Sequence, residues 1–291
     1  MNSTKRLLRF LTLITLATLF VAALAGCNSG DASSEASTDP EATAETIGLL
    51  AGASPNTSLL SIYAYDGASV YRVHTADIAT TNAVLETLSG VSYSEAPDWT
   101  IDDVTLPVFG VEIGRADGTV IQAAWSNGYW IAQDGSVYHY DFDFNTLTSE
   151  YDLVGGMEFP NFSNFPNART LTQDDTGWNT YLLTPVDALT PVRGVSMTLD
   201  SIEDGTAQLS ITNSSGAEFN YGEFFEVQVQ IAGTWYSVPV AQANVAFPDI
   251  AHILRAGEAA TQSYNLNIYG DLPDGNYRIV AYGLSAEFTL P

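Results

Sequence analysis

Hydrophobic and polar residues alternate over many short segments of this chain, which is the pattern of β-strands with one buried face. In the first half, dipeptides that favour the positive φ angles of tight hairpin turns separate these segments. The dipeptides are Asp66-Gly67, Asp117-Gly118, Asn127-Gly128 and Asp134-Gly135. The strands predicted around them are 59–65, 69–73, 106–115, 119–125, 129–132 and 136–142. The last four should pair in order as an antiparallel meander.

One segment between these strands has helical spacing. In residues 76–88, Ile78, Val84, Leu85 and Leu88 recur as one apolar stripe. Thr75 could cap this helix, and Gly90 is placed to end it. A single helix packed on a meander sheet predicts an α+β domain of two layers over residues 55–160.

The second half changes to shorter alternating strands. The candidates are 195–199, 206–212, 224–231, 235–240, 263–268, 277–282 and 286–290. Short strands of this number and spacing predict an all-β immunoglobulin-like sandwich over residues 192–291. Tyr277 has the spacing of a tyrosine corner, in which the hydroxyl bonds the backbone upstream. Residues 161–191 lack periodicity and form a linker or a long packed loop.

Motifs in this half resemble a bacterial Ig-like domain found in Gram-positive envelope lipoproteins. They are Asn220-Tyr221-Gly222-Glu223, Gly233-Thr234-Trp235-Tyr236, Leu254-x-x-Gly257-Glu258 and Leu272-Pro-x-Gly275-x-Tyr277-Arg278. The resemblance implies a β-sandwich that serves as a module of envelope proteins, without an active site. Trp235 is expected in the sandwich core, with a binding patch of Trp235 and Tyr236 as the alternative. His252 is expected in a loop or helical turn and has no assigned role.

The N-terminus has the features of an export signal. Lys5, Arg6 and Arg9 precede an apolar run over residues 10–23, which is shorter than the ~20 residues of a transmembrane helix. The next four residues, Leu24-Ala25-Gly26-Cys27, resemble the lipobox of bacterial lipoproteins. The resemblance implies cleavage before Cys27 and attachment of a diacylglyceryl group to its sulfur. Residues 1–26 are thus a predicted lipoprotein signal peptide; an uncleaved N-terminal anchor is the alternative.

Residues 27–54 join the predicted lipid anchor to the first domain. From residue 28 to residue 46 the segment has no large apolar side chain, five acids and no base. Such a composition cannot bury enough surface to fold, so we expect a flexible acidic tether. The predicted location is the cell membrane, on its extracytoplasmic face, with the membrane reached through the lipid on Cys27.

The cysteine content and the net charge limit which metal sites and binding partners are expected. Cys27 is the only cysteine among 291 residues, so we expect no disulfide and no thiolate metal site. Cleavage of the leader would leave six arginines and no lysine against 34 acidic residues. So acidic a surface repels phosphate backbones, which argues against a nucleic-acid partner. It is either simply a solvated surface or one with affinity for cations and cationic partners.

Aromatic residues give one candidate binding site in the first domain. Tyr138, Tyr140, Phe142 and Phe144 alternate with polar residues and therefore share one face. We expect them to line the core against the helix. The alternative is a platform for sugars or peptides, joined by further aromatic residues, Trp125, Tyr129 and Trp130.

Two patterns bear on metal binding. Asp141-x-Asp143-x-Asn145 resembles the opening of a calcium loop, with Asp152 at its twelfth position. Thr146, however, replaces the glycine that the sharp turn of such a loop requires. His74 and His139 could meet on neighbouring strands, but isolated histidines on strands are more often ordinary polar residues. We therefore expect neither a metal nor a cofactor.

No motif of a catalytic class occurs: no G-x-S-x-G, no H-E-x-x-H, no phosphate-binding glycine loop. The sequence therefore favours a non-catalytic binding or interaction protein of the envelope, whose partner is an envelope protein or a cell-wall glycan. Two alternatives remain open. One is a glycan-active or other hydrolytic lipoprotein that uses a carboxylate pair ~5–9.5 Å apart in the 55–160 domain. The other is an accessory subunit of an envelope transport or sensing complex.

Overall fold

The computed structural model describes residues 59–114, 118–150, 154–242 and 245–291. The predicted signal peptide, the lipobox with Cys27, and the tether lie outside these residues. Within the described ranges, no helix has the length and apolar character needed to cross a membrane.

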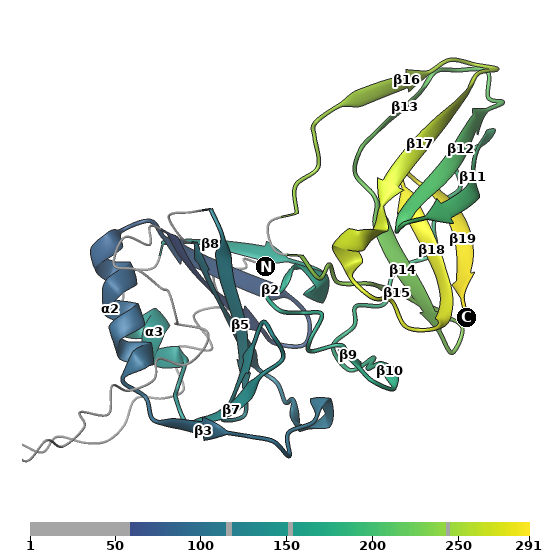
Figure 1. The fold of residues 1–291 in the computed structure, drawn as a ribbon. Coiled ribbons are helices and arrows are strands. Elements are labelled where there is room, and N and C mark those ends of the chain that lie inside the picture. The colour runs from purple at the N-terminus through teal and green to yellow at the C-terminus, as the bar shows by residue number, and fades with distance from the viewer. Residues whose placement is uncertain (1–58, 115–117, 151–153, 243–244) are drawn as a thin grey trace, which may run out of the picture. The chain divides into compact units, whose positions relative to one another are not determined.

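The first domain is built on one antiparallel sheet of eight strands in the order β3-β7-β6-β5-β4-β1-β2-β8 (Figure 1). The strands are β1 (Leu59–Tyr65), β2 (Val70–Thr75), β3 (Tyr93–Glu95), β4 (Val108–Gly114), β5 (Val120–Ser126), β6 (Tyr129–Ala132), β7 (Val137–Tyr140) and β8 (Val154–Phe159). The predicted meander is present as β4 to β7. The β1–β2 hairpin joins the same sheet beside β4, and the short edge strands β3 and β8 are additions that the sequence pattern did not predict.

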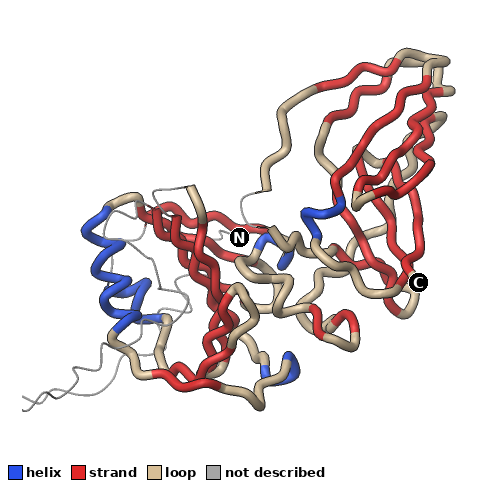
Figure 2. The backbone as a smooth tube through the Cα atoms, in the orientation of Figure 1, coloured by secondary structure: helices blue, strands red, loops and turns tan. Residues whose placement is uncertain are grey.

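Two helices lie together on one side of this sheet, as Figure 2 shows. The long one, α2 (Ile78–Ser89), is the predicted helix, and Gly90 forms its C-cap as expected. Its N-cap is Asp77 and not Thr75, because the Asp77 carboxylate accepts a hydrogen bond from the Thr80 amide at 2.7 Å. The Thr75 hydroxyl instead accepts from the Asp77 amide. The short helix α3 (Asn145–Glu150) was not predicted.

The sheet face toward the helices, here called the helix face, carries the larger apolar core of this domain. Side chains at every second position of the strands meet Val84 and Leu88 of α2. The buried members from the strands are Leu60, Ile62, Phe109, Val111, Ile113, Ile121, Ala123, Trp130 and Tyr140. Phe144 and Leu147, at α3, complete this core.

The opposite sheet face, here called the second face, is covered by the segment that follows β8. This segment, residues 160–184, is called the connection. It contains a short 3-10 helix (Phe162–Asn164) and the two-residue strands β9 (Gln173–Asp174) and β10 (Gly177–Trp178). Phe162, Phe165 and Leu182 from the connection are buried in a second apolar core with Tyr63 and Tyr65 of β1. The sheet is therefore buried on both faces.

The aromatic run at residues 138–144 belongs to the helix-face core. Tyr140 and Phe144 are fully buried, and Tyr138 and Phe142 are half-buried against the same core. The Tyr140 hydroxyl donates a hydrogen bond of 2.5 Å to the carbonyl oxygen of Leu88, at the end of α2. These contacts support the core interpretation of the run and leave no open aromatic platform there.

The second domain is a β-sandwich, as predicted. Its strands are β11 (Val195–Glu203), β12 (Thr206–Asn213), β13 (Phe219–Gly222), β14 (Glu226–Ile231), β15 (Thr234–Ser237), β16 (Ala251–Leu254), β17 (Ala259–Asn265), β18 (Gly275–Ala281) and β19 (Leu284–Leu290). They form sheets in the orders β11-β12-β17 and β15-β14-β18-β19, with a separate pair, β13-β16. A 3-10 helix (Leu266–Tyr269) replaces the end of the predicted strand 263–268.

Tyr277, His252 and Trp235 of this domain can be compared with the positions predicted for them. The tyrosine corner is confirmed, because the Tyr277 hydroxyl donates a 2.6 Å hydrogen bond to the carbonyl oxygen of Pro273. The position predicted for His252 is wrong, since it lies in strand β16, paired with Tyr221 of β13. Trp235 is only half-buried, with the Arg278 guanidinium 4.3 Å from its ring centroid, and is not a core residue.

The bond between Tyr140 and Leu88 ties the sheet to the end of α2, and this gives a first prediction. Tyr140→Phe removes one buried hydrogen bond while keeping the ring, so we expect a loss of about 1–2 kcal/mol in the free energy of unfolding. Urea denaturation followed by circular dichroism would measure it. Tyr138→Phe is the control, because that half-buried ring packs on the same core. Equal stability of the two variants would contradict the assigned role of the bond.

Candidate functional site

A row of polar side chains crosses the second face of the sheet. Strand register places His74 of β2 opposite Ser61 of β1, Ser61 opposite Glu112 of β4, and Glu112 opposite Gln122 of β5. These positions alternate with the apolar positions that face the helices, so all four side chains project from the second face. We call His74, Ser61, Glu112 and Gln122 the polar row.

A hollow lies over this part of the second face. Two side chains of the polar row, Glu112 and Gln122, line it together with Tyr63 and Arg72, which face each other on β1 and β2. The connection forms its rim and adds these polar side chains to the lining: Ser163, Asn164, Asn167, Arg169 and Thr170. The strands thus form one side of the hollow, its floor, and the connection another, and residues of the second domain complete the lining: Val240, Ala241, Gln242 and Val245.

The rim is held by direct contacts with the sheet. The Asn167 side-chain amide donates to the carbonyl oxygens of Ile131 and Ala132 in β6, at 3.2 and 3.0 Å. The Thr170 hydroxyl donates to the Asn167 side-chain oxygen at 2.8 Å. Gly110 of β4 lets the connection approach closely, because a Cβ there would lie 2.5 Å from Pro166. The absence of a side chain at Gly110 therefore allows Pro166 and Phe165 to pack directly against β4.

Three charged side chains line the hollow, Arg72, Arg169 and Glu112. Arg169 donates to the carbonyl oxygen of Asp271, and its guanidinium lies 4.3 Å from the ring centroid of Trp178.

Arg72 and Glu112 are the two opposite charges on the sheet, and no ion pair in the described part of the chain neutralises them. Among the described residues, ion pairs join His252 to Glu223 and Arg255 to Glu258, and neither involves Arg72 or Glu112. Glu112 accepts a 3.0 Å hydrogen bond from the Gln122 amide, which is a neutral group. Arg72 donates to the Met157 sulfur at 3.1 Å, and its buried Nε has no partner in the structure. Both charges are only half-buried.

The charges of Glu112 and Arg72 have opposite effects on the phenol of Tyr63. Burial raises the pKa of Tyr63 above its ordinary value, the Glu112 carboxylate raises it further, and Arg72 acts in the opposite direction. The Tyr63 phenol therefore stays protonated at neutral pH. It can donate a hydrogen bond to an anionic group or accept one from a cationic group in the hollow.

The polar row contains the residue types of a hydrolase triad in an arrangement unsuited to that chemistry. In a triad the histidine lies between the nucleophile and the acid, because it takes the proton of one and is oriented by the other. Here Ser61 lies between His74 and Glu112. Ser61 is also only 2% exposed, which leaves no approach for a substrate carbonyl. The polar row therefore does not have the order or the access of a Ser-His-acid triad.

The metal patterns considered from sequence do not come together as sites. The Asp143 carboxylate accepts bonds from the backbone and side chain of Asn145 at 3.0 and 2.8 Å, in the turn that begins α3. Asp152 lies outside the described residues. His74 and His139 are not on neighbouring strands, because β6, β5, β4 and β1 separate β2 from β7. In the described ranges, no group of three or more His, Cys, Asp or Glu side chains could hold a metal ion.

The sequence contains only a weak signal of the hollow. Strand β4 reads Val-Phe-Gly-Val-Glu-Ile-Gly, so Glu112 and Gly110 share the face that a buried sheet would fill with apolar residues. Arg72 interrupts β2 in the same way. Placing a charged side chain at an inward position costs free energy unless it is paired or hydrogen-bonded, so such a residue is a candidate for a functional site. The positions of Arg72 and Glu112 become informative only when the structure shows that both faces of the sheet are covered.

A second polar cluster lies in the sandwich domain. Glu223 bonds His252 Nε2 at 2.6 Å and accepts from the Gln262 amide at 2.9 Å. His252 also stacks on Tyr221, with ring centroids 5.0 Å apart. Because both oxygens of Glu223 have partners, the cluster connects β13 and β16 to β17. We assign it a structural role.

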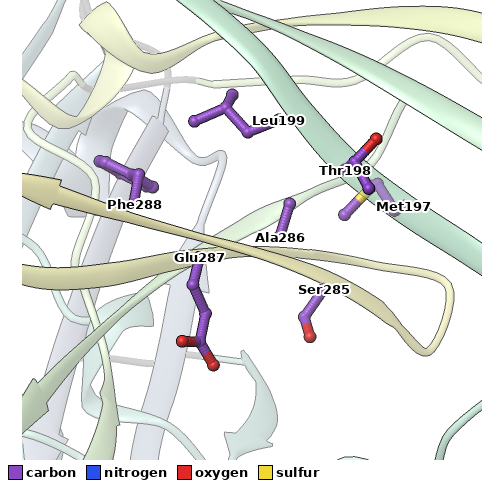
Figure 3. A pocket seen from close by; sticks show the side chains of 7 residues that line it. All are labelled: Met197, Thr198, Leu199, Ser285, Ala286, Glu287 and Phe288. Atoms are coloured by element: carbon purple, nitrogen blue, oxygen red, sulfur yellow. The ribbon is translucent and has the colours of Figure 1, made fainter.

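The sandwich also has a groove between strands β11 and β19, with a volume of about 440 Å³. Figure 3 shows Ser285 and Glu287 on the side of β19 opposite Ala286 and Phe288. Met197, Ala286 and Phe288 belong to the sandwich core, so the groove is the seam between the two sheets. It brings no set of converging polar groups, and its geometry does not favour a ligand site.

Comparison with known proteins identifies the second domain. Residues 192–289 match the family model of the bacterial Ig-like domain. The match confirms that this domain resembles a bacterial Ig-like domain, and it agrees with the observed sandwich. No curated protein and no solved structure matches the chain. The family match does not extend to the first domain, whose strands and connection supply most of the residues that line the hollow.

The close approach at Gly110 gives a second prediction. Gly110→Ala places a methyl group against Pro166 and Phe165 and must displace the connection, so we expect a loss of about 1–3 kcal/mol in unfolding free energy. Gly156→Ala in β8 is the matched control, because a Cβ there meets no atom within 4 Å. Denaturant titration of both variants measures the difference. Equal stability would show that the connection does not rest on Gly110.

Proposed function

We propose that this protein is a lipid-anchored protein of the bacterial cell envelope with a non-catalytic binding role, and that the hollow of the first domain is its ligand site. The observation that carries the proposal is the convergence of Arg72, Glu112 and Tyr63 on one hollow over a sheet buried on both faces. Ligand sites typically combine a pre-formed concave surface with a few fixed polar groups.

The remaining parts of the chain fit this role. The bacterial Ig-like domain is a β-sandwich whose seam offers no converging polar groups. The lipobox resemblance at residues 24–27 supports membrane attachment through Cys27. Two or more acyl chains hold a protein on a membrane stably, whereas one alone binds marginally. The acidic segment that follows would keep the folded domains clear of the lipid headgroups.

The hollow gives less support to the hydrolytic alternative. Retaining and inverting glycosidases both need two carboxyl groups on either side of the glycosidic bond that is cleaved. Among the described residues that line the hollow, Glu112 is the only acid. Ser61 is buried and not flanked by its base and acid in the required order.

The binding role predicts that filling the hollow abolishes ligand capture. Gln122→Trp puts a large ring among the lining residues, and we expect it to lose binding of any compound that the wild-type chain captures from a library of cell-wall fragments and small polar metabolites. Thermal-shift and calorimetric titration would measure this. Ser94→Trp on the edge strand β3 is the control, because that side chain is exposed. Turnover of a captured compound that depends on Glu112 would replace binding with catalysis.

The membrane anchor predicts a separate outcome. Cys27→Ser removes the only sulfur that could carry the lipid, so we expect the exported chain to move from the membrane pellet to the soluble fraction. Ser29→Ala, two residues further along, should remain in the pellet. Mass spectrometry of the N-terminal peptide would verify the lipid on the wild-type chain. A Cys27→Ser chain that stayed in the membrane after export would rule out the lipoprotein assignment.

A further inference from the structure

The charges of the hollow indicate what kind of ligand it accepts, and this step rests on the binding role proposed above. Arg72 and Glu112 come from β2 and β4, on either side of β1. Their Cα atoms are offset by two positions in register, so strand spacing and rise place them about 12 Å apart. Two long side chains projecting from these points can hold a small molecule between their charged ends.

A ligand with a single charge would leave either Glu112 or Arg72 without a partner, even though Arg169 also lines the hollow. An anion would bind Arg72 but face the uncompensated Glu112 carboxylate, in a protein whose formal charge is already −25. A cation would bind Glu112 but approach the Arg72 guanidinium, whose buried Nε lacks a partner. Desolvating a charge without a partner costs free energy, so each of these ligands is disfavoured.

A ligand with both charges removes each conflict. Its carboxylate can pair with the planar guanidinium of Arg72, which suits carboxylates geometrically. Its ammonium can pair with Glu112, whose other contact is with the neutral Gln122 amide. The protonated Tyr63 phenol lies within reach of both charged groups and can bond either end of the ligand.

We propose that the hollow binds a small zwitterion with one ammonium and one carboxylate group, of the size of an amino acid or a dipeptide. Arg72 holds the carboxylate, Glu112 holds the ammonium, and Tyr63 and Gln122 bond the polar atoms between them. The two ligand sizes share this chemistry, and a length series separates them.

The test uses the full chain in detergent, with pools of free amino acids and of dipeptides as probes. Calorimetric titration of the best binder is then repeated with its N-acetyl derivative, which lacks the ammonium, and with its amide, which lacks the carboxylate. Loss of a hydrogen bond to a charged group should weaken binding about ten- to a hundredfold in each case. This comparison needs no variant, so it does not depend on how a mutation folds.

Variants assign each charge to its partner. Arg72→Gln should weaken binding of the zwitterion at least about tenfold but leave the amide unaffected, and Glu112→Gln should do the same relative to the N-acetyl form. Arg193→Gln and Glu86→Gln are the controls, because both side chains are exposed and do not line the hollow. Thermal melting of each variant shows that it is folded.

The outcomes separate this inference from the proposed function. Binding of N-acetyl and amide forms as tight as the parent would overturn the zwitterion assignment while the binding role stands. A ligand captured in the hollow that carries one charge or none would do the same. If Gln122→Trp leaves every captured ligand bound, the site itself is wrong and both proposals fail.

Discussion

The structure depends on the burial of one sheet on both of its faces. Strand β1 lies between β4 and β2 and sends Leu60 and Ile62 to the helices, and Tyr63 and Tyr65 to the connection. On the second face, Tyr65 packs on Phe162 with centroids 4.7 Å apart, and Phe162 stacks on Phe165 at 5.0 Å. Full burial of each such ring is worth about 2–3 kcal/mol, and each aromatic pair adds about 1 kcal/mol. These contacts hold a segment with little regular structure against the sheet.

Much of the fold could be predicted from local sequence. Glycine-containing turns and strict alternation located β4 to β7, and β6 was placed to the residue. The sandwich was predicted from strand spacing and from motifs, including the bond of Tyr277. The short strands β3, β13 and β16 were missed because, unlike the equally short β6, they are not flanked by Asn-Gly or Asp-Gly turns. The N-cap of α2 was misplaced by two residues because Thr75 and Asp77 are both good capping residues.

The candidate site was much less predictable than the fold. The sequence shows Arg72, Glu112 and Gln122 as isolated polar residues in separate strands, and only the strand order makes them neighbours. For residues 161–191 the sequence left a linker and a long packed loop as alternatives, and without a hydrophobic period it did not indicate which surface such a loop would cover. The aromatic run at 138–144 was conspicuous in sequence for the opposite reason. These aromatic side chains belong to the core. Large core side chains are easy to recognise in a sequence, whereas a hollow on the surface of a core has no sequence pattern of its own.

The strand origin of the hollow's floor has a consequence for how its specificity could change. Each floor residue belongs to a different strand, and its backbone is fixed by hydrogen bonds to neighbours on both sides. Exchange of one such side chain alters the chemistry of the site without disturbing a turn or a helix end. Because the apolar residues of the helix-face core occupy the alternate positions, that core and the charged groups of the hollow are encoded by separate sets of residues. Tyr63 is an exception, since it belongs to the second-face core and also lines the hollow. A scaffold of this kind can diversify its ligands while its fold remains constant.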